Sequence, residues 1–282
     1  MLDLNNFSHS HDLVEIVHHG RFTCVRKTFQ SDLLRATRNI EKQRLFQPIY
    51  TGDVRVCAAE VLEFSVSSDR AELLMPYVEG MTGHMFLVSA TRNIASTLSS
   101  ALSTLLYAEL KECREEQVAT TLFETKLAQV YADTPHEELK RKVESCLLKV
   151  KALPSELAFP IGPCHGDLTL GNIILNPVSG LTLIDFLDTY LETPLQDVAK
   201  LKQDFIYGWS FRKNSASLAV KAEIISRYHF PQAFVQIERI YPIQVQLLTL
   251  MALARISPYV KDAITKEWLI NSLTVCLEDF PI

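Results

Sequence analysis

The sequence predicts an α+β fold of two unequal lobes, a small antiparallel β-sheet followed by a larger, mainly helical part. The N-terminal region contains short runs rich in Val, Phe and Cys that are broken by Gly, Ser or Asp, a pattern typical of strands. Farther along, apolar side chains recur mainly at helical spacing. We therefore expect an N-terminal lobe over residues 1–79 and a C-terminal lobe over residues 80–282, joined by a short hinge.

Four strands and one helix are expected in the N-terminal lobe. The helix falls within residues 31–49, where Ser31 is a candidate N-cap, apolar residues follow helical spacing, and Pro48 marks the end. The expected strands are residues 14–20, 21–29, 54–67 and 71–78.

The C-terminal lobe opens with long helical patterns over residues 91–153, with a break near residues 133–135. The run CHGDLTLGNIILNPVSGLTLIDF then interrupts the helices and predicts a hairpin of strands 173–175 and 181–184. Helical patterning returns at Pro194. One apolar face of that helix is expected to hold Leu195, Val198, Leu201 and Phe205.

Composition narrows the class of partner. The formal net charge is −5, so the chain lacks the broad basic excess of a protein that binds nucleic acid or anionic membranes. No basic segment followed by an apolar run opens the chain, and no eighteen-residue stretch is both apolar and uncharged. The six cysteines lack the spacing of a zinc site and are expected to be reduced thiols. We expect a cytoplasmic protein that acts on a small molecule.

Three oxygen-bearing side chains lie at the two ends of the expected hairpin. Folding the hairpin brings Asp167, Asn172 and Asp185 together, and the oxygens of Asn172 and Asp185 are the ligands that Mg²⁺ prefers. Asp167 lies on a Gly-flanked loop, where its carboxylate can face a substrate hydroxyl as the base. His165, two residues away, is an alternative base, although we expect it instead to brace this loop by hydrogen bonds. The set fits phosphoryl transfer, which depends on positioning and on neutralising phosphate charge.

The segment from His165 to Asn172 resembles the HxDxxxxN motif of the aminoglycoside phosphotransferase and choline kinase family, whose fold is like that of protein kinases. Ile184-Asp185-Phe186 resembles its second metal-binding motif, and Asp197-Val198-Ala199-Lys200-Leu201 is also similar. The resemblance implies that Asp167 is catalytic, that Asn172 and Asp185 bind Mg²⁺, and that Asp197 is structural. It also implies ATP or GTP as co-substrate.

The resemblance extends to the N-terminal lobe. Lys27 in RFTCVRKTF is similar to the lysine that contacts nucleotide phosphates, and Glu41 to its helix partner. Glu15 and Glu60 compete for that role, and Glu41 could instead simply face solvent. The stretch LLMPYVEG resembles the hinge, which implies that Met75 and Tyr77 line the base pocket. Residues 17–21 contain a single glycine where a phosphate-covering turn is expected, so the choice between ATP and GTP stays open.

The family's acceptors include aminoglycosides, choline, ethanolamine, amino-acid alcohols and sugars. Candidate acceptor-binding residues are Asp188, Tyr190 and Trp209, which offer carboxylate and aromatic surfaces. An aminoglycoside site usually needs a broad anionic surface, for which 33 acidic against 28 basic residues give only modest support, so we expect a sugar or amino-alcohol kinase. A non-catalytic nucleotide-binding protein is a further alternative, whereas a protein kinase is disfavoured because no APE-like segment follows Asp185.

Overall fold

The computed structural model describes residues 13–51, 54–89, 92–176, 180–214, 224 and 230–281. A four-stranded antiparallel sheet begins the fold, with strand order β1-β2-β6-β5. Each strand pairs at least one neighbour in antiparallel register, for example Lys27 opposite Leu73. The strands are β1 (Leu13–His19), β2 (Phe22–Phe29), β5 (Glu63–Val66) and β6 (Ala71–Pro76).

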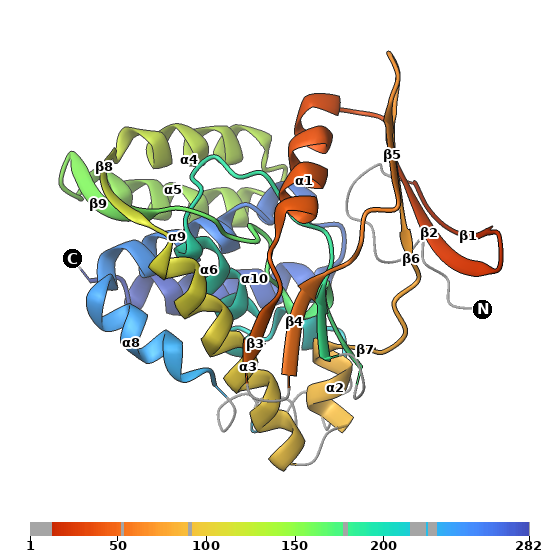
Figure 1. Cartoon of the computed structure of the whole chain (residues 1–282). Coiled ribbons are helices and arrows are strands. Elements are labelled where there is room, and N and C mark those ends of the chain that lie inside the picture. The colour runs from red at the N-terminus through yellow and green to blue at the C-terminus, as the bar shows by residue number, and fades with distance from the viewer. Residues whose placement is uncertain are drawn as a thin grey trace.

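Helix α1 (Leu33–Leu45) stands beside this sheet, as Figure 1 shows. Its N-cap is Asp32 instead of the expected Ser31, because the Asp32 carboxylate accepts the Arg35 N–H at 3.2 Å. Ala36 and Ile40 are buried in a small apolar cluster shared with β2 and β6. Helix α1 therefore packs against the first sheet, and it also extends toward the C-terminal lobe.

A second, five-stranded sheet joins distant parts of the chain in the order β3-β4-β11-β10-β7. The expected single strand 54–67 was wrong: β4 lies in this sheet and β5 in the first. Between them the Ala59 N–H donates to Leu183 O and the Leu62 N–H to Leu74 O, both at 2.9 Å, so the chain changes sheets there. The strands are β3 (Ile49–Thr51), β4 (Val54–Ala58), β7 (Met81–Thr82), β10 (Ile173–Asn176) and β11 (Gly180–Leu183).

The predicted hairpin is confirmed, with β10 and β11 antiparallel and Ile173 opposite Leu183. At the expected hinge, Gly80 has φ +155° and lies against β10, where an added Cβ would be 2.4 Å from Leu175 O. A larger residue at this position would therefore separate β7 from β10.

Helices make up most of the rest of the described chain, as predicted. The break expected near residues 133–135 is present, since one helix ends at Asp133 and the next begins at Glu137. The expected continuous helical region also contains a strand, β8 (Arg114–Ala119), which pairs antiparallel with β9 (Glu156–Ile161). Its sequence REEQVA has no apolar alternation and is mostly exposed, so pairing with β9 decides its conformation. The helices are α2 (Gly83–Ser89), α3 (Arg92–Lys111), α4 (Thr121–Asp133), α5 (Glu137–Lys151), α6 (Pro194–Phe205), α8 (Gln232–Ile240), α9 (Pro242–Ala254) and α10 (Ala263–Glu278).

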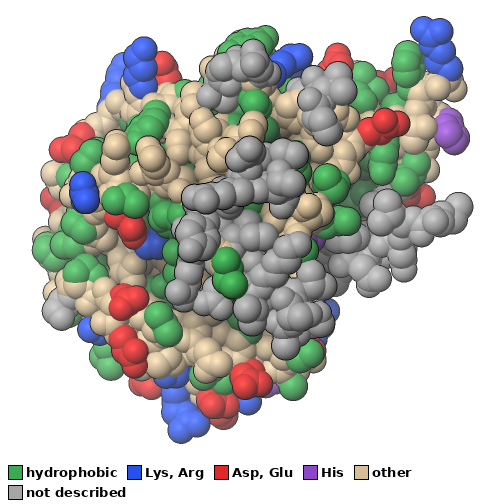
Figure 2. Space-filling model, turned by 90° about the horizontal axis from the view of Figure 1, so that it is seen from below, with side chains coloured by type: hydrophobic (Ala, Val, Ile, Leu, Met, Phe, Trp, Pro, Cys, Tyr) green, Lys and Arg blue, Asp and Glu red, His purple; other side chains and the backbone are tan. Residues whose placement is uncertain are grey.

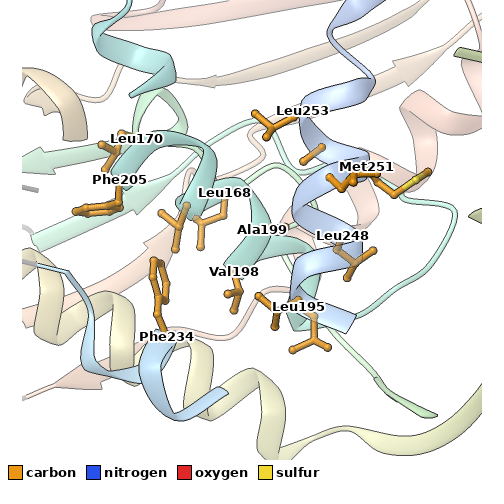
Figure 3. Packing of buried hydrophobic residues seen from close by; sticks show 14 of the residues in the cluster. Leu168, Leu170, Leu195, Val198, Ala199, Phe205, Phe234, Leu248, Met251 and Leu253 are labelled. Atoms are coloured by element: carbon orange, nitrogen blue, oxygen red, sulfur yellow. The ribbon is translucent and has the colours of Figure 1, made fainter. Parts of the chain in front are cut away.

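Helix α6 lies at the centre of the helical part and is buried along its whole length. Thr193 caps its N-terminus and Pro194 occupies the first turn. Figure 3 shows α6 packed beside α9, with Leu168 and Leu170 entering the same apolar core. Both leucines are fully buried, and each such side chain contributes about 2 kcal/mol of hydrophobic stabilisation. The loop that carries Asp167 is thereby fastened to α6.

Over the described part of the chain, no single helix has the length and apolarity to cross a membrane. The segments Gln232–Ile240 and Pro242–Tyr259 pass that test only as a pair bent by 114°. All six cysteines are free thiols. On the face shown in Figure 2, acidic and basic side chains are interspersed over the described surface.

Candidate active site

A short loop between β9 and β10 carries the first motif, and its backbone is held from two sides. The Asp197 carboxylate, in the first turn of α6, accepts the His165 N–H at 2.5 Å and the Gly166 N–H at 2.8 Å. On the other side the Leu187 N–H donates to His165 O at 2.9 Å. Gly166 has φ +88°, a conformation that glycine adopts without steric cost.

His165 is fully buried under the loop. Its Nε2 lies 2.9 Å from Ile184 O, and its Nδ1 accepts the Asp167 N–H at 3.2 Å. Its ring packs at a tilt of 34° against Phe186, with centroids 4.2 Å apart. Burial lowers the pKa of His165 to about 4, so the imidazole is neutral near pH 7. These contacts support the expected bracing role.

The Asp167 carboxylate lies between two partners and keeps 31% of its side chain exposed. Lys200 Nζ is 2.9 Å from Oδ1, and Asn172 Nδ2 is 3.1 Å from Oδ2. The same Asn172 nitrogen also donates to Asp167 O at 2.8 Å. Burial alone would raise the pKa of Asp167, but the neighbouring Lys200 ammonium and Arg255 guanidinium outweigh it and lower the pKa. The site therefore holds an ionised, oriented carboxylate.

Asp185 follows β11 and adopts φ +60°, a left-handed conformation that costs energy for residues other than glycine. Its carboxylate is 41% exposed and lies 3.1 Å from Lys27 Nζ on β2. The Lys27 side chain is only 15% exposed. This ion pair joins the first sheet to the second motif across 158 positions of sequence. The structure thus brings Lys27 and Asp185 together.

The expected pairing of Lys27 with Glu41 was wrong. Glu41 is exposed on α1, and the described residues contain no ion pair between it and Lys27. The side chain that faces the sheet is Gln43, whose Nε2 donates to Ala59 O at 2.8 Å. Helical spacing explains why Gln43 and not Glu41 faces the sheet, because Ala36, Ile40 and Gln43 form the buried face of α1.

Lys42, next to Glu41, makes the contact from α1 to the second lobe. Its ammonium lies 2.6 Å from Glu192 Oε2 and donates to Leu187 O at 2.8 Å. Burial lowers the pKa of Lys42, but Cys164 and Glu192 raise it, and the net shift is upward. The pairing of Lys42 with Glu192 was not predicted from the sequence, because it joins two segments 150 residues apart.

The two hinge residues differ in accessibility. Met75 is buried in the apolar cluster beneath α1, with its sulfur 4.0 Å from Gln43 Nε2. Tyr77 is half-buried, and its N–H donates to Thr23 O at 3.0 Å. Met75 is therefore enclosed in the core, whereas Tyr77 stays partly accessible.

Two of the three candidate acceptor residues already have other partners. The Asp188 carboxylate lies 2.9 Å from Arg38 Nε, and its N–H donates to Asn39 Oδ1 at 2.6 Å. Tyr190 packs edge-on against Phe123, with centroids 6.1 Å apart. Its hydroxyl is buried, and burial raises its pKa to about 12. Asp188 thus anchors α1 and Tyr190 packs in the core, which argues against both as acceptor ligands.

Trp209 lies in a short 3₁₀ turn after α6 and stays partly accessible. Arg212 Cζ is 3.4 Å from the centre of its ring, and the Trp268 ring lies beside it, tilted by 56°, with centroids 5.2 Å apart. The turn is tied to the first motif through Asp204, which accepts both the Ser210 N–H at 2.9 Å and the Leu170 N–H at 2.6 Å. Trp209 remains a candidate for acceptor binding.

Three polar side chains on α6 contact the loop in register. Asp197 binds residues 165 and 166, Lys200 contacts Asp167, and Asp204 binds Leu170. Their spacing of three and four residues places them on one helix face. Sequence reasoning singled out neither Lys200 nor Asp204. The signal that could have found them is a second, polar stripe beside the apolar one in PLQDVAKLKQDF.

The residues present fit a magnesium ion. With its amide nitrogen committed to Asp167, Asn172 has its amide oxygen available, and the Asp185 carboxylate is exposed. No group of three or more His, Cys, Asp or Glu side chains suited to a metal occurs among the described residues. Magnesium typically takes one or two protein oxygens and completes its shell with phosphates and water, so two ligands suffice.

Comparisons with known proteins agree with this geometry. A family model described as "Phosphotransferase enzyme family" matches residues 44–221. No curated protein matches the chain by sequence. Among solved structures, the GDP complex of wild-type aminoglycoside 2'-phosphotransferase-IIIa aligns with a TM-score of 0.54 and 14% identity, covering 98% of this chain and 95% of that one.

Two structures of aminoglycoside phosphotransferase APH(4)-Ia resemble this chain to about the same degree. One has a TM-score of 0.55 and 11% identity, with 95% of this chain and 94% of that chain covered. A ternary complex of a thermostable mutant with AMP-PNP and hygromycin B has a TM-score of 0.55 and 12% identity, with 98% and 96% covered. The predicted kinase-like α+β fold is confirmed, and the chain belongs to the phosphotransferase enzyme family.

Proposed function

We propose that this chain transfers the γ-phosphoryl group of ATP or GTP to a hydroxyl of a small metabolite, a sugar or an amino alcohol, with Mg²⁺. That it is a phosphotransferase with an alcohol acceptor follows from its family. The observation that carries the proposal is the Asp167 carboxylate, held at one oxygen by Lys200 and at the other by Asn172.

Each residue has one task in the proposed reaction. Asp167 accepts the hydrogen bond of the acceptor hydroxyl and receives its proton as the oxygen bonds to the γ-phosphorus. Asn172 and Asp185 hold Mg²⁺, which neutralises charge on the phosphates when bound. Lys27, whose ammonium faces Asp185, donates to the phosphate oxygens. The hinge at Tyr77 receives the base.

The arrangement of charge favours a neutral or singly charged acceptor over a polycationic aminoglycoside. Carboxylates near the loop are already paired: Asp188 with Arg38, and Glu192 with Lys42. Asp197 and Asp204 are buried and bind backbone N–H groups. Lys200, and Arg255 at the end of α9, add positive charge beside Asp167. A polycation would meet repulsion there, and the four carboxylates named above are already committed to other partners.

The test is nucleotide consumption across a panel of acceptors. ADP or GDP release is measured with Mg²⁺ and each of several monosaccharides, choline, ethanolamine, amino-acid alcohols and aminoglycosides. We expect one neutral or singly charged acceptor to stimulate release, and Asp167→Asn to remove that stimulation while nucleotide affinity is kept. Asp69→Asn, an exposed carboxylate in the β5–β6 turn, is the matched control and should behave as wild type.

Other outcomes are informative. Stimulation by aminoglycosides alone would replace the sugar or amino-alcohol assignment with an aminoglycoside-modifying enzyme. Nucleotide binding without stimulation by any acceptor, even in the presence of Mg²⁺, would favour a non-catalytic nucleotide-binding protein on this fold.

A further inference from the structure

Helix α6 buries two lysines, Lys200 at 8% exposure and Lys202 at 6%. Lysine is seldom buried, because an ammonium loses its hydration and must find a partner. Each of these lysines has one carboxylate partner: Glu238 of α8 for Lys202, and Asp167 for Lys200. The same helix therefore provides two ion pairs of the same type, each with a buried ammonium and a partly exposed carboxylate, and only the Lys200 pair involves the reacting site.

Stability alone does not explain the Lys200 pair. Replacing a buried ion pair by apolar side chains of similar volume is often neutral or stabilising, so such pairs are weak evidence for a stabilising role. Lys200 lies on the polar stripe of α6 between Asp197 and Asp204, and its ammonium faces the Asp167 carboxylate. The ammonium is better explained by what it does to Asp167.

The position of Lys200 is fixed by its neighbours on the polar stripe of α6. Asp197, one turn before it, binds two loop N–H groups, and Asp204, one turn after it, binds a third. Leu168 and Leu170 pack into the core beside the same helix, as Figure 3 shows. The loop therefore cannot slide along α6, and Lys200 Nζ stays at 2.9 Å from Asp167 Oδ1.

We propose that Lys200 is a positioning residue of the phosphotransferase, which holds the Asp167 carboxylate in the orientation that receives the acceptor hydroxyl. This inference rests on the proposed function. Lys200 fixes Oδ1 and Asn172 fixes Oδ2, and each oxygen retains a lone pair for the acceptor. During transfer the acceptor oxygen bonds to the γ-phosphorus, the bond from that phosphorus to the bridging oxygen breaks, and the hydroxyl proton passes to Asp167. Lys200 keeps its proton throughout.

The first experiment compares Lys200→Met and Lys200→Arg with Lys202→Met, a matched control on the same helix. We expect Lys200→Met to lower kcat by about 100-fold, the loss typical of a misplaced catalytic group. Because the lysine is expected to act through Asp167, the Kd for Mg²⁺-nucleotide should stay within about twofold of wild type. Lys200→Arg should recover part of kcat, since it keeps the charge. Lys202→Met should keep kcat within about threefold of the wild-type value, whatever its effect on stability.

A double-mutant cycle with Asp167→Asn decides whether Lys200 acts through Asp167. If it does, Lys200→Met should lower residual turnover no further in the Asp167→Asn background. Additive losses, or equal kcat in Lys200→Met and Lys202→Met, would overturn the proposal. The same double-mutant cycle can be measured on the free energy of unfolding, which requires no turnover. A nonzero coupling energy between Lys200→Met and Asp167→Asn would confirm the contact. If that coupling is found but no acceptor is phosphorylated, the proposed function fails while the pairing of Lys200 with Asp167 stands.

Discussion

Gly166 offers the sharpest structural prediction, because its backbone conformation and its surroundings both exclude a side chain. Its φ is +88°, and a Cβ would lie 2.1 Å from Leu187 O and 2.9 Å from Thr189 Cγ2. Real Cβ atoms essentially never approach another heavy atom within 3.0 Å. The nearest atom is backbone, so no rotamer change relieves the contact, and the loop itself must move.

The cost of Gly166→Ala can be built from its parts. The positive φ costs an alanine about 1–2 kcal/mol. Moving the loop weakens the Leu187–His165 hydrogen bond, which contributes about 1 kcal/mol, and the N–H bonds to the Asp197 carboxylate, which contribute about 1.5–3 kcal/mol each. We expect a loss of about 4 kcal/mol in the free energy of unfolding, together with a large loss of kcat because Asp167 follows directly.

Gly208→Ala is the matched control. Gly208 has φ +70° but no atom within 4 Å of the added Cβ, so only the conformational cost of about 1 kcal/mol applies. The assay is urea unfolding followed by circular dichroism, with both variants and wild type under one set of conditions. A difference between the two variants of less than about 1 kcal/mol would refute the close packing of the loop against residues 187–189.

Two further predictions concern the first and second motifs. The pKa of buried His165 is lowered to about 4, so between about 4 and its unfolded value of about 6.5 the unfolded chain binds a proton that the folded protein does not. Stability therefore falls as pH drops through this window, by about 2 kcal/mol at pH 5 relative to pH 7, and thermal unfolding of His165→Gln should lack that part of the loss. Asp185→Ala should weaken binding of Mg²⁺-nucleotide more than binding of nucleotide alone. A loss of calorimetric affinity, relative to wild type, that is the same with and without Mg²⁺ would contradict its role as a metal ligand.

Local patterns predicted much of the fold. The hairpin 173–184, helix α1 and helix α6 each carry a clear period or turn signal, and all three are present. Strand β8 was missed because its polar sequence is strand-forming only through its partner β9. The split of residues 54–67 into β4 and β5 was missed because β4 pairs with β11, a strand more than 120 residues away.

The site divides in the same way. Asp167 and Asn172 are predictable because they share one short loop, and Asp185 because the hairpin returns it to them. The predicted pairing of Glu41 with Lys27 was wrong because neighbouring residues of a helix point about 100° apart. That rotation turns Glu41 to solvent while Lys42 faces the C-terminal lobe. Lys200 could be found only once α6 was seen to lie against the loop.

The most direct test of the account is to follow the phosphoryl group itself. Phosphorus NMR of a reaction with Mg²⁺, ATP or GTP and the responding acceptor should show a phosphomonoester of that acceptor with wild-type protein. The same signal should be absent with Asp167→Asn at equal nucleotide occupancy. If only inorganic phosphate forms, or if the variant makes the ester at the wild-type rate, hydroxyl phosphorylation through Asp167 is contradicted.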